Sequence, residues 1–357
     1  MIVWAIAAVA CAYQILAIAA CLRFCAYLKN KPAASQGPPV SILKPVAGLD
    51  KGLIPAIESH SKLPGDYELL CGVRSLDDPA AAAIRPFPRV RAIECRTPAP
   101  NGKVGTLMDL AREARHDIFI VNDADICVEP DYIARVAAPL SDPRVGLVTC
   151  LYRAEGSTFP ARFEALGVAT DFAPSALVGW LMGLDEFAGG STLAFRRADL
   201  ARIGGFEAIA EYLADDYQLG HRLRALGLRC ALGRAIVSTH LEGGWWDVWR
   251  HQIRWARTIR VSNLPGYLSL PATFATLWAV VAAIAGNWIA AAAVLGARML
   301  MALVSGRIMQ SRDARRLWAL VPLRDLFASA IWALGLFGNA VVWRGQRLRI
   351  DAEGRIR

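Results

Sequence analysis

The strongest constraint on the fold is the placement of three long uncharged segments. Residues 1–22, 261–297 and 326–343 contain no Asp, Glu, Lys or Arg, and they help to make 55% of the chain hydrophobic. Each segment approaches or exceeds the roughly 18–20 apolar residues that cross a bilayer as a helix. Residues 29–260 have ordinary polarity and are numerous enough for one sizeable domain. The sequence therefore predicts a membrane protein whose globular domain lies between apolar ends.

The first apolar segment has two interpretations, an uncleaved anchor and a cleaved signal peptide. Its uncharged run is longer than the ~7–15 residues of a signal-peptide core, and no basic residue precedes it, which favours the anchor. Arg23, Lys29 and Lys31 follow it. Because basic flanks stay on the cytoplasmic side of a span, we expect a multi-pass protein with its N-terminus outside and its globular domain in the cytoplasm.

The C-terminal apolar third leaves two alternatives. Residues 266–305 predict two membrane helices that turn near residues 286 and 287. If residues 326–343 then crossed the membrane, the basic residues after them would lie outside, against the positive-inside rule, whereas a re-entrant segment would avoid that conflict. The predicted divisions of the chain are an anchor (1–28), a cytosolic domain (29–260), transmembrane or re-entrant helices (261–345) and a basic tail (346–357).

The net charge indicates which partners to expect, and the cysteine content indicates the redox state of the compartment. The formal net charge is +9. The Arg residues lie mostly beside the apolar segments, so we assign the excess to anionic lipid headgroups rather than to nucleic acid, for which no motif is present. The eight cysteines form no CxxC pair and no Cys/His cluster with zinc spacing. This pattern predicts a reducing compartment and no structural metal.

Strand-like and helix-like stretches alternate through the middle of the chain. The predicted strands are 40–46, 67–73, 88–95, 117–125 and 145–152, and the predicted helices include 102–116 and 130–140. This order is typical of an α/β domain with a mainly parallel sheet, in which ligands bind at the carboxyl ends of strands. Four acids follow predicted strands: Asp77, Asp78, Asp123 and Asp125.

Two acidic pairs each have a functional and a structural interpretation. Residues 122–125 read NDAD, and side chains two residues apart on a strand point the same way. Asp123 and Asp125 would then offer hard oxygen ligands to Mg²⁺ or Mn²⁺, or else act as a helix cap and a turn residue. Asp215 and Asp216 begin a predicted helix, where they fit either capping or a general base facing a cleft.

Residues 245–260, rich in Trp and Arg, predict a helix at the membrane interface. Helical spacing brings Trp245 and Trp249 to one side, with Arg254 and Trp255 beyond them. Trp enrichment is typical of an interfacial helix, and the fork of the Arg254 guanidinium suits a phosphate. The alternative is an amphipathic anchor without a binding role.

Taken in order, these motifs resemble those of the membrane-bound glycosyltransferases of the GT-A fold, and in particular glycosyltransferase family 21, the ceramide glucosyltransferase-like group. That family carries an early Asp, a DxD-like motif, a third Asp and a (Q/R)xxRW motif. The matching positions here are Asp77 or Asp78, Asp123 with Asp125, Asp216, and Arg254 with Trp255. The resemblance extends along most of the chain, including its flanking apolar segments.

Two further segments carry the resemblance, and two positions depart from it. The stretch NGKVGTL looks like the family's Gly-Lys segment and would bring Lys103 near the nucleotide, and residues 187–206 resemble the segment before the third Asp. His251 occupies the first position of the (Q/R)xxRW motif, and Asp215 stands where Glu is common. These departures bear on the identity of the sugar and of the acceptor.

The resemblance implies an inverting transfer of a hexose from a UDP-sugar, with UDP-glucose first, to the hydroxyl of a lipid such as ceramide. Asp123 and Asp125 would hold Mg²⁺ or Mn²⁺ on the diphosphate, and Asp216 would deprotonate the acceptor. The other donor contacts implied are Asp77, Asp78, Lys103, Arg254 and Trp255. The acceptor or interface residues are Trp245, Trp249 and His251.

Other functions remain open on the sequence. A hopanoid-type lipid N-acetylglucosaminyltransferase would keep every motif and change only the sugar and acceptor pockets. A polysaccharide synthase shares the acidic motifs but needs more membrane helices for a channel. A membrane scaffold with an inactive domain has no need of the acids. The apolar stretch 163–187 fits either an acceptor groove or an ordinary packed helix pair.

Overall fold

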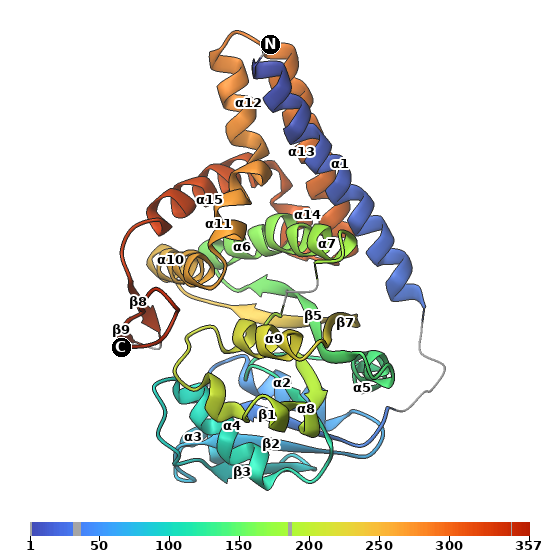
Figure 1. The fold of residues 1–357 in the computed structure, drawn as a ribbon, viewed down its shortest axis with the longest axis vertical. Helices are drawn as coiled ribbons and strands as arrows, with labels where there is room; N and C mark the ends of the chain where they lie inside the picture. Colours follow the sequence, from blue (N-terminus) through green and yellow to red (C-terminus); the bar gives the residue numbers. More distant parts are fainter. Residues whose placement is uncertain (1, 31–36, 185–187, 344) are drawn as a thin grey trace.

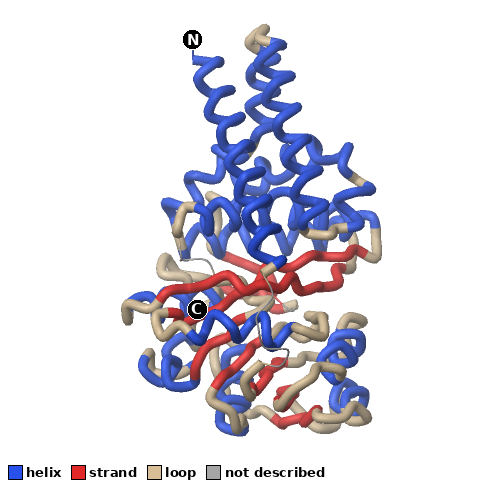
Figure 2. The backbone as a smooth tube through the Cα atoms, turned by 90° about the vertical axis from the view of Figure 1, so that its right-hand side faces the viewer, coloured by secondary structure: helices blue, strands red, loops and turns tan. Residues whose placement is uncertain are grey.

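The computed structural model describes residues 2–30, 37–184, 188–343 and 345–357. One end of the molecule is made of helices, whereas strands and helices are mixed toward the other end (Figures 1 and 2). The strands of the main sheet are β1 (Val40–Pro45), β2 (Tyr67–Val73), β3 (Val90–Glu94), β4 (Ile118–Val121), β5 (Val145–Gly156), β6 (Leu193–Arg196) and β7 (Arg229–Leu241). Their order is β3-β2-β1-β4-β6-β5-β7, and every neighbouring pair is parallel except those made by β6. The predicted α/β domain with a mainly parallel sheet is confirmed.

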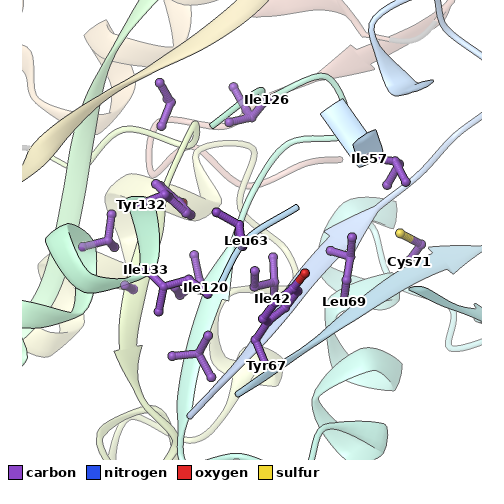
Figure 3. Packing of buried hydrophobic residues seen from close by; sticks show 14 of the residues in the cluster. Ile42, Ile57, Leu63, Tyr67, Leu69, Cys71, Ile120, Ile126, Tyr132 and Ile133 are labelled. Carbon is purple, nitrogen blue, oxygen red and sulfur yellow. The ribbon is translucent and has the colours of Figure 1, made fainter. Parts of the chain in front are cut away.

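Both faces of this sheet are covered, and every residue of β1 and β2 is accordingly buried. The covering helices and short turns are α2 (Leu53–Ser61), α3 (Pro79–Ile84), α4 (Gly102–Glu113), α5 (Tyr132–Ala137), η1 (Ala138–Ser141), α8 (Arg197–Arg202), η3 (Phe206–Ile209) and α9 (Asp215–Ala225). Successive side chains of a strand point to opposite faces. Ile42 accordingly packs with Ile120 and Tyr132 in one core (Figure 3), and its neighbour Leu43 packs with Phe195 in the other.

Several predicted boundaries shift by a few residues. The strand predicted over 145–152 continues to residue 156, and the helix predicted over 102–116 ends at residue 113. The helix predicted over 130–140 begins at Tyr132 and continues as a 3₁₀ turn to residue 141.

Three helices project together from the globular part (Figure 1). They are α1 (Ile2–Lys29), α12 (Ala275–Ile284) and α13 (Trp288–Ile308). Val3–Lys29 and Trp288–Ile308 are long and apolar enough to cross a membrane, and Leu264–Thr273 with Ala275–Ile284 adds a third span if the pair, bent by 54°, is counted as one. Buried alanines at the contacts, including Ala10, Ala279 and Ala290, allow close helix approach.

The turn between α12 and α13 lies where the sequence predicts it. Gly286 has a φ of +75°, which favours glycine, and the Asn287 side chain accepts a hydrogen bond from the Ala290 N–H to begin α13. This hairpin and the start of α1 lie together at the far end of the bundle (Figure 1). The globular domain lies at the other end, so it occupies one side of any membrane that the bundle crosses.

A layer of helices separates the bundle from the sheet (Figure 1). α6 (Phe159–Gly167), the π-helix η2 (Val168–Phe172) and α7 (Ala173–Leu181) run on as one continuous helix. Beside it lie α10 (Trp245–Ser262) and α15 (Val321–Gly335), which pack against each other. The connecting elements are α11 (Leu264–Ser269), η4 (Leu270–Thr273), α14 (Arg312–Arg316) and η5 (Trp318–Leu320).

The last apolar segment does not cross the membrane. α15 ends at Gly335, and the chain continues as a hairpin of β8 (Ala340–Trp343) and β9 (Gln346–Arg349). Beyond it, the Leu213 N–H donates to the Gly354 carbonyl at 3.1 Å. The tail therefore lies on the same side as the globular domain. Of the two sequence alternatives, the structure does not adopt the outward crossing of residues 326–343, and the conflict with the positive-inside rule disappears.

A buried ion pair ties the bundle to this layer. Arg298, on α13, donates to both carboxylate oxygens of Asp325, on α15, at 2.8 and 2.6 Å. It also donates to the Thr170 carbonyl in the π-helix at 2.8 Å, and Thr276 donates to Asp325 at 2.6 Å. Both charged side chains are almost fully buried, so each depends on the other for its hydrogen bonds.

We expect Arg298→Met to lower the free energy of unfolding by about 3–5 kcal/mol, because it leaves the Asp325 carboxylate buried without its partner. The double variant Arg298→Met/Asp325→Leu should recover much of that loss, because it removes the orphaned charge. Denaturant unfolding in lipid nanodiscs measures both. A double variant no more stable than the single variant would contradict this account.

Candidate active site

Three elements bring charged side chains together at the carboxyl edge of the sheet. Lys103 lies in the first turn of α4, Asp123 follows β4, and Asp215 is the first residue of α9. The Lys103 ammonium is 2.9 Å from Asp123 Oδ1 and 3.2 Å from Asp215 Oδ2. The Lys103 and Asp215 side chains are 9% and 10% exposed, whereas that of Asp123 is 44% exposed. Asp123 is therefore the member of this cluster that solvent or a ligand can reach.

Local sequence explains how Lys103 and the acids meet. Asn101 caps α4 by accepting hydrogen bonds from the N–H groups of Lys103 and Val104 at 3.0 and 3.3 Å. Gly190 leaves room above the cluster. A Cβ atom at residue 190 would lie 3.2 Å from Asp216 Oδ2 and 3.7 Å from Asp123 Oδ2. The Asp123 and Asp216 carboxylates therefore converge on the space that this glycine keeps open.

The NDAD turn rests on a lysine that sequence reasoning missed. The Lys44 ammonium, fully buried at the end of β1, donates to the carbonyls of Asp123 at 2.7 Å, Ala124 at 3.4 Å and Ile126 at 3.3 Å. Burial lowers the pKa of Lys44 to about 8. The available signal was a lysine within an otherwise apolar strand, VSILKPV.

Asn122 fixes the start of the same turn. Its amide donates to the Tyr132 hydroxyl at 2.9 Å, the Ser191 carbonyl at 2.8 Å and the Thr192 hydroxyl at 3.1 Å. Asp125, two positions beyond Asp123, accepts a hydrogen bond from the Thr239 hydroxyl on β7. The main chain that carries Asp123 is therefore held by buried polar side chains from several elements.

The surroundings of Asp125 raise its pKa above the ordinary value of an aspartate. Burial raises the pKa of Asp125, the Thr239 hydroxyl opposes that shift, and the charge of Asp123 adds to it. Within the described ranges, the carboxylates of the two acids are directed at other side chains rather than at a helix N-terminus, because Asp123 pairs with Lys103 and Asp125 with Thr239. Asp123 and Asp125 therefore cap none of the described helices, but they do lie in a turn, because β4 ends at Val121 and not at residue 125 as predicted.

Asp216 has the electrostatic character of a base that works near neutral pH. Burial first, and then the charge of Asp215, raise the pKa of Asp216 to about 6, against the opposing charge of Lys103. Its Oδ1 accepts a hydrogen bond from the Tyr217 N–H at 2.8 Å. A carboxylate with a pKa near the working pH combines a large deprotonated fraction with useful basicity.

Asp77 and Asp78 lie at the carboxyl end of β2, on the same edge of the sheet but separated from β4 by β1. Asp78 caps α3 by accepting a hydrogen bond from the Ala80 N–H at 2.8 Å, whereas Asp77 is exposed. In the described part of the chain, no hydrogen bond or ion pair joins either acid to Lys103. The structure thus places them beside the cluster rather than within it.

α10, in the helical layer between the bundle and the sheet, carries Arg254 and Trp255. Burial lowers the pKa of Arg254, while the charges of Asp123 and Asp216 oppose that shift. The Trp255 ring centroid is 4.6 Å from that of His251 and 6.0 Å from that of Phe172.

His251 contacts a buried acid that no sequence motif singles out. His251 Nδ1 lies 2.6 Å from Glu164 Oε1, on α6, and the neighbouring Gln252 amide donates to the same oxygen at 2.7 Å. Trp245 packs edge-on against Phe163 with a centroid distance of 5.4 Å and is 51% exposed. The exposure of Trp245 fits the predicted interface, whereas the His251 side chain is 27% exposed beside Glu164.

The acids fit a divalent cation that takes most of its ligands from a substrate. Among residues 2–30, 37–184, 188–343 and 345–357, no three His, Cys, Asp or Glu side chains gather as a metal site. Mg²⁺ is often bound by only one or two carboxylates and completed by phosphate oxygens and water. Asp123, whose side chain is 44% exposed, and Asp125, two positions further on, are the acids that could offer carboxylate oxygens of that kind.

Comparisons with known proteins agree with the motif order. The description "Glycosyl transferase family 21" matches residues 2–356. Ceramide glucosyltransferase 1 of Caenorhabditis elegans is 31% identical over 213 residues, which cover 57% of this chain and 44% of that relative. Ceramide glucosyltransferase 3 of the same organism is 30% identical over 205 residues, covering 55% and 44%. The aligned region thus spans less than half the length of these relatives.

A solved structure described as "Crystal Structure of a Mycobacterial Protein" is 18% identical, with a TM-score of 0.39, and the match covers 67% of this chain and 77% of that one. The family pattern, by contrast, extends over nearly every residue described above. With that coverage, this chain belongs to glycosyl transferase family 21.

Proposed function

We propose that this chain transfers a hexose from a UDP-sugar to the hydroxyl of a membrane lipid, with UDP-glucose and ceramide as the first pair to test. The observation that carries the proposal is the convergence of Asp216, whose pKa is near neutrality, with the Lys103–Asp123 pair at the carboxyl edge of the sheet. The names of the two curated relatives support the choice of ceramide.

The donor would lie along this edge of the sheet. Asp77, exposed at the end of β2, would bind the nucleotide, and Asp78 would keep the loop in place by capping α3. Asp123 and Asp125 would hold Mg²⁺ or Mn²⁺, which when bound would neutralise charge on the diphosphate. Arg254 would contribute a second positive charge to the leaving UDP.

The transfer step follows from the position of Asp216. Its carboxylate would accept the proton of the acceptor hydroxyl while that oxygen forms a bond to the anomeric carbon. The bond between the anomeric carbon and the diphosphate oxygen breaks, and its electron pair leaves with UDP. A single displacement from the opposite face inverts the anomeric configuration. Lys103 would balance the charges of Asp123 and Asp215, with which it pairs, throughout the step.

The lipid would enter from the layer formed by α6, α10 and α15. Trp245, Trp246, Leu323 and Phe337 in or beside this layer are each more than half exposed. Large apolar side chains on a surface beside membrane helices are typical of contact with lipid. We propose that this layer faces the cytoplasmic leaflet, in keeping with the basic residues that follow α1.

Direct assay of the purified full chain tests the function. UDP-glucose, UDP-galactose and UDP-N-acetylglucosamine are each offered with ceramide or a hopanoid, in nanodiscs with Mg²⁺ or Mn²⁺. Formation of glucosylceramide would support the proposal. Transfer of N-acetylglucosamine to the hopanoid alone would replace the donor and acceptor with those of the alternative. No transfer in any combination would contradict a lipid glycosyltransferase of either kind.

Asp216→Asn should lower kcat by about 10²–10⁴-fold, because an amide cannot accept the acceptor proton, and should leave UDP affinity within about twofold. In the unaltered chain the active form of Asp216 is the carboxylate, so kcat/KM should fall as the pH drops through about 6. Profiles of kcat/KM over roughly pH 4.5–9, the range in which perturbed carboxyl groups titrate, measure this fall on the acid limb. An acid limb that persists in the residual activity of Asp216→Asn would assign it to another group.

Lys44→Met should weaken metal-dependent UDP binding by about 10-fold or more, because the main chain under Asp123 loses three hydrogen bonds although Lys44 touches no ligand. Stability should fall by roughly 1–3 kcal/mol from the unsatisfied carbonyls. Calorimetry of UDP binding with and without Mg²⁺ measures the first effect. Lys51→Met, at an exposed lysine, is the matched control. Equal UDP affinities for the two variants would show that Lys44 does not shape the site.

A further inference from the structure

The segment after α15 is fastened to α10 by two arginines. Arg257 Nε donates to the Phe337 carbonyl at 3.0 Å, and Arg260 Nη2 donates to the Gly338 carbonyl at 2.8 Å. Both guanidiniums make further hydrogen bonds within residues 336–340. The last carbonyls of a helix lack intrahelical partners, and cations near them are stabilising. These hydrogen bonds from α10 thus hold the start of the C-terminal segment in place.

The tail segment, defined as residues 345–357, then pairs with the loop that precedes α9. The Leu213 N–H donates to the Gly354 carbonyl at 3.1 Å, and the Ile356 N–H donates to the Glu211 carbonyl at 2.7 Å. These hydrogen bonds add the tail segment to one side of the loop in the manner of a neighbouring strand. The loop leads directly into Asp215 and Asp216, so the tail segment holds the main chain just before the acidic pair.

The opposite side of the same loop is held by the residue that caps α4. The Asn101 side chain donates to the Tyr212 carbonyl at 2.8 Å, and the Asn101 N–H donates to the Ala210 carbonyl at 2.9 Å. Main-chain groups of the loop thus alternate between Asn101 and the tail segment. Asn101 also caps α4, the helix that contains Lys103. The loop is therefore hydrogen-bonded to the start of α4 on one side and to the tail segment on the other.

A small apolar cluster fills the space between these parts. Leu213 of the loop, Val341 of β8 and Ile350 of the tail segment are buried together, and Val261 of α10 packs against them. This cluster is separate from the two cores of the main sheet. Loss of the tail segment would therefore leave the sheet cores intact while freeing one side of the loop.

We propose that the tail segment is a positioning element of the active site, which sets the separation between Arg254 on α10 and Asp216 on α9. Arg254 lies one turn before Arg257, which holds the start of the C-terminal segment, and Asp216 closely follows Leu213, which pairs with its end. The inference rests on the proposed function, because the role of Asp216 is defined by that function. Residues of the tail segment would thus have a positioning role although they carry no reactive group.

Asp351→Ala tests this role with little risk to the fold. The Asp351 carboxylate accepts hydrogen bonds from the Arg355 N–H at 2.8 Å and from Arg357 Nε at 2.9 Å, so it builds the turn that presents Gly354 and Ile356 to the loop. Arg347→Met is the matched control, because Arg347 lies exposed in β9 of the same segment. A chain lacking residues 352–357 is the second variant.

We expect Asp351→Ala and the shortened chain to lose about 10–100-fold in kcat, because a base displaced by about 1 Å costs that much, while UDP affinity and the unfolding midpoint stay near those of Arg347→Met. Amide hydrogen exchange of Leu213 should be faster in both variants. In an Asp216→Asn background, Asp351→Ala should lower kcat little further. A loss of folded protein would instead lower kcat by the same factor in the unaltered chain and in the Asp216→Asn background.

The outcomes separate this inference from the proposed function. An unaltered chain that transfers no sugar would overturn both. An active chain in which Asp351→Ala and the shortened form keep kcat within about twofold of Arg347→Met would overturn only the positioning role, since a 1 Å displacement should cost far more. If Asp351→Ala caused the same proportional loss in the unaltered chain and in the Asp216→Asn background, the positioning role would also be overturned, because that result would show a general loss of active protein.

Discussion

The Lys103 ammonium is the charge on which the arrangement of the site depends. It is nearly buried, and it is matched by Asp123 after β4 and by Asp215 at the start of α9. Burial alone would lower the pKa of Lys103, but the two acids raise it above its usual value, so Lys103 remains charged. Because an unpaired charge of either sign is costly in such a place, each of the three elements fixes the others. The acids are thereby assembled before any ligand arrives.

The second organising constraint is the junction between a polar domain and apolar helices. Every buried polar group there needs a polar partner, since neither lipid tails nor apolar side chains can supply a hydrogen bond. Arg298 meets this need by bonding to Asp325 and to a carbonyl of the π-helix, and Glu164 does so by accepting hydrogen bonds from His251 and Gln252. These contacts join α6 to α10 and tie α13 of the bundle to α15 of the layer, and α10 carries Arg254.

Much of this could be predicted from sequence, because periodicity and residue order are local signals. The parallel sheet, the acids after β2 and β4, and the paired acids that open α9 follow from them. Lys44 could not be selected, since its role depends on a turn 80 residues away, and Glu164 gives no local sign of its buried partners. The path of the C-terminus was left undecided because apolarity does not distinguish a crossing helix from α15, which lies in the layer (Figure 1).

The π-helix η2 lets one helix serve two different neighbours. Before it, Ala165 packs with Ala154 of β5, and after it Leu177 packs in the cluster that includes Phe24 of α1. An additional residue in a helical turn rotates everything beyond it by about 100°. Removing a single residue between 168 and 172 would therefore swing α7 away from α1 while leaving α6 in place. In this segment the number of residues, and not only their kind, therefore determines how the membrane anchor is aligned with the catalytic domain.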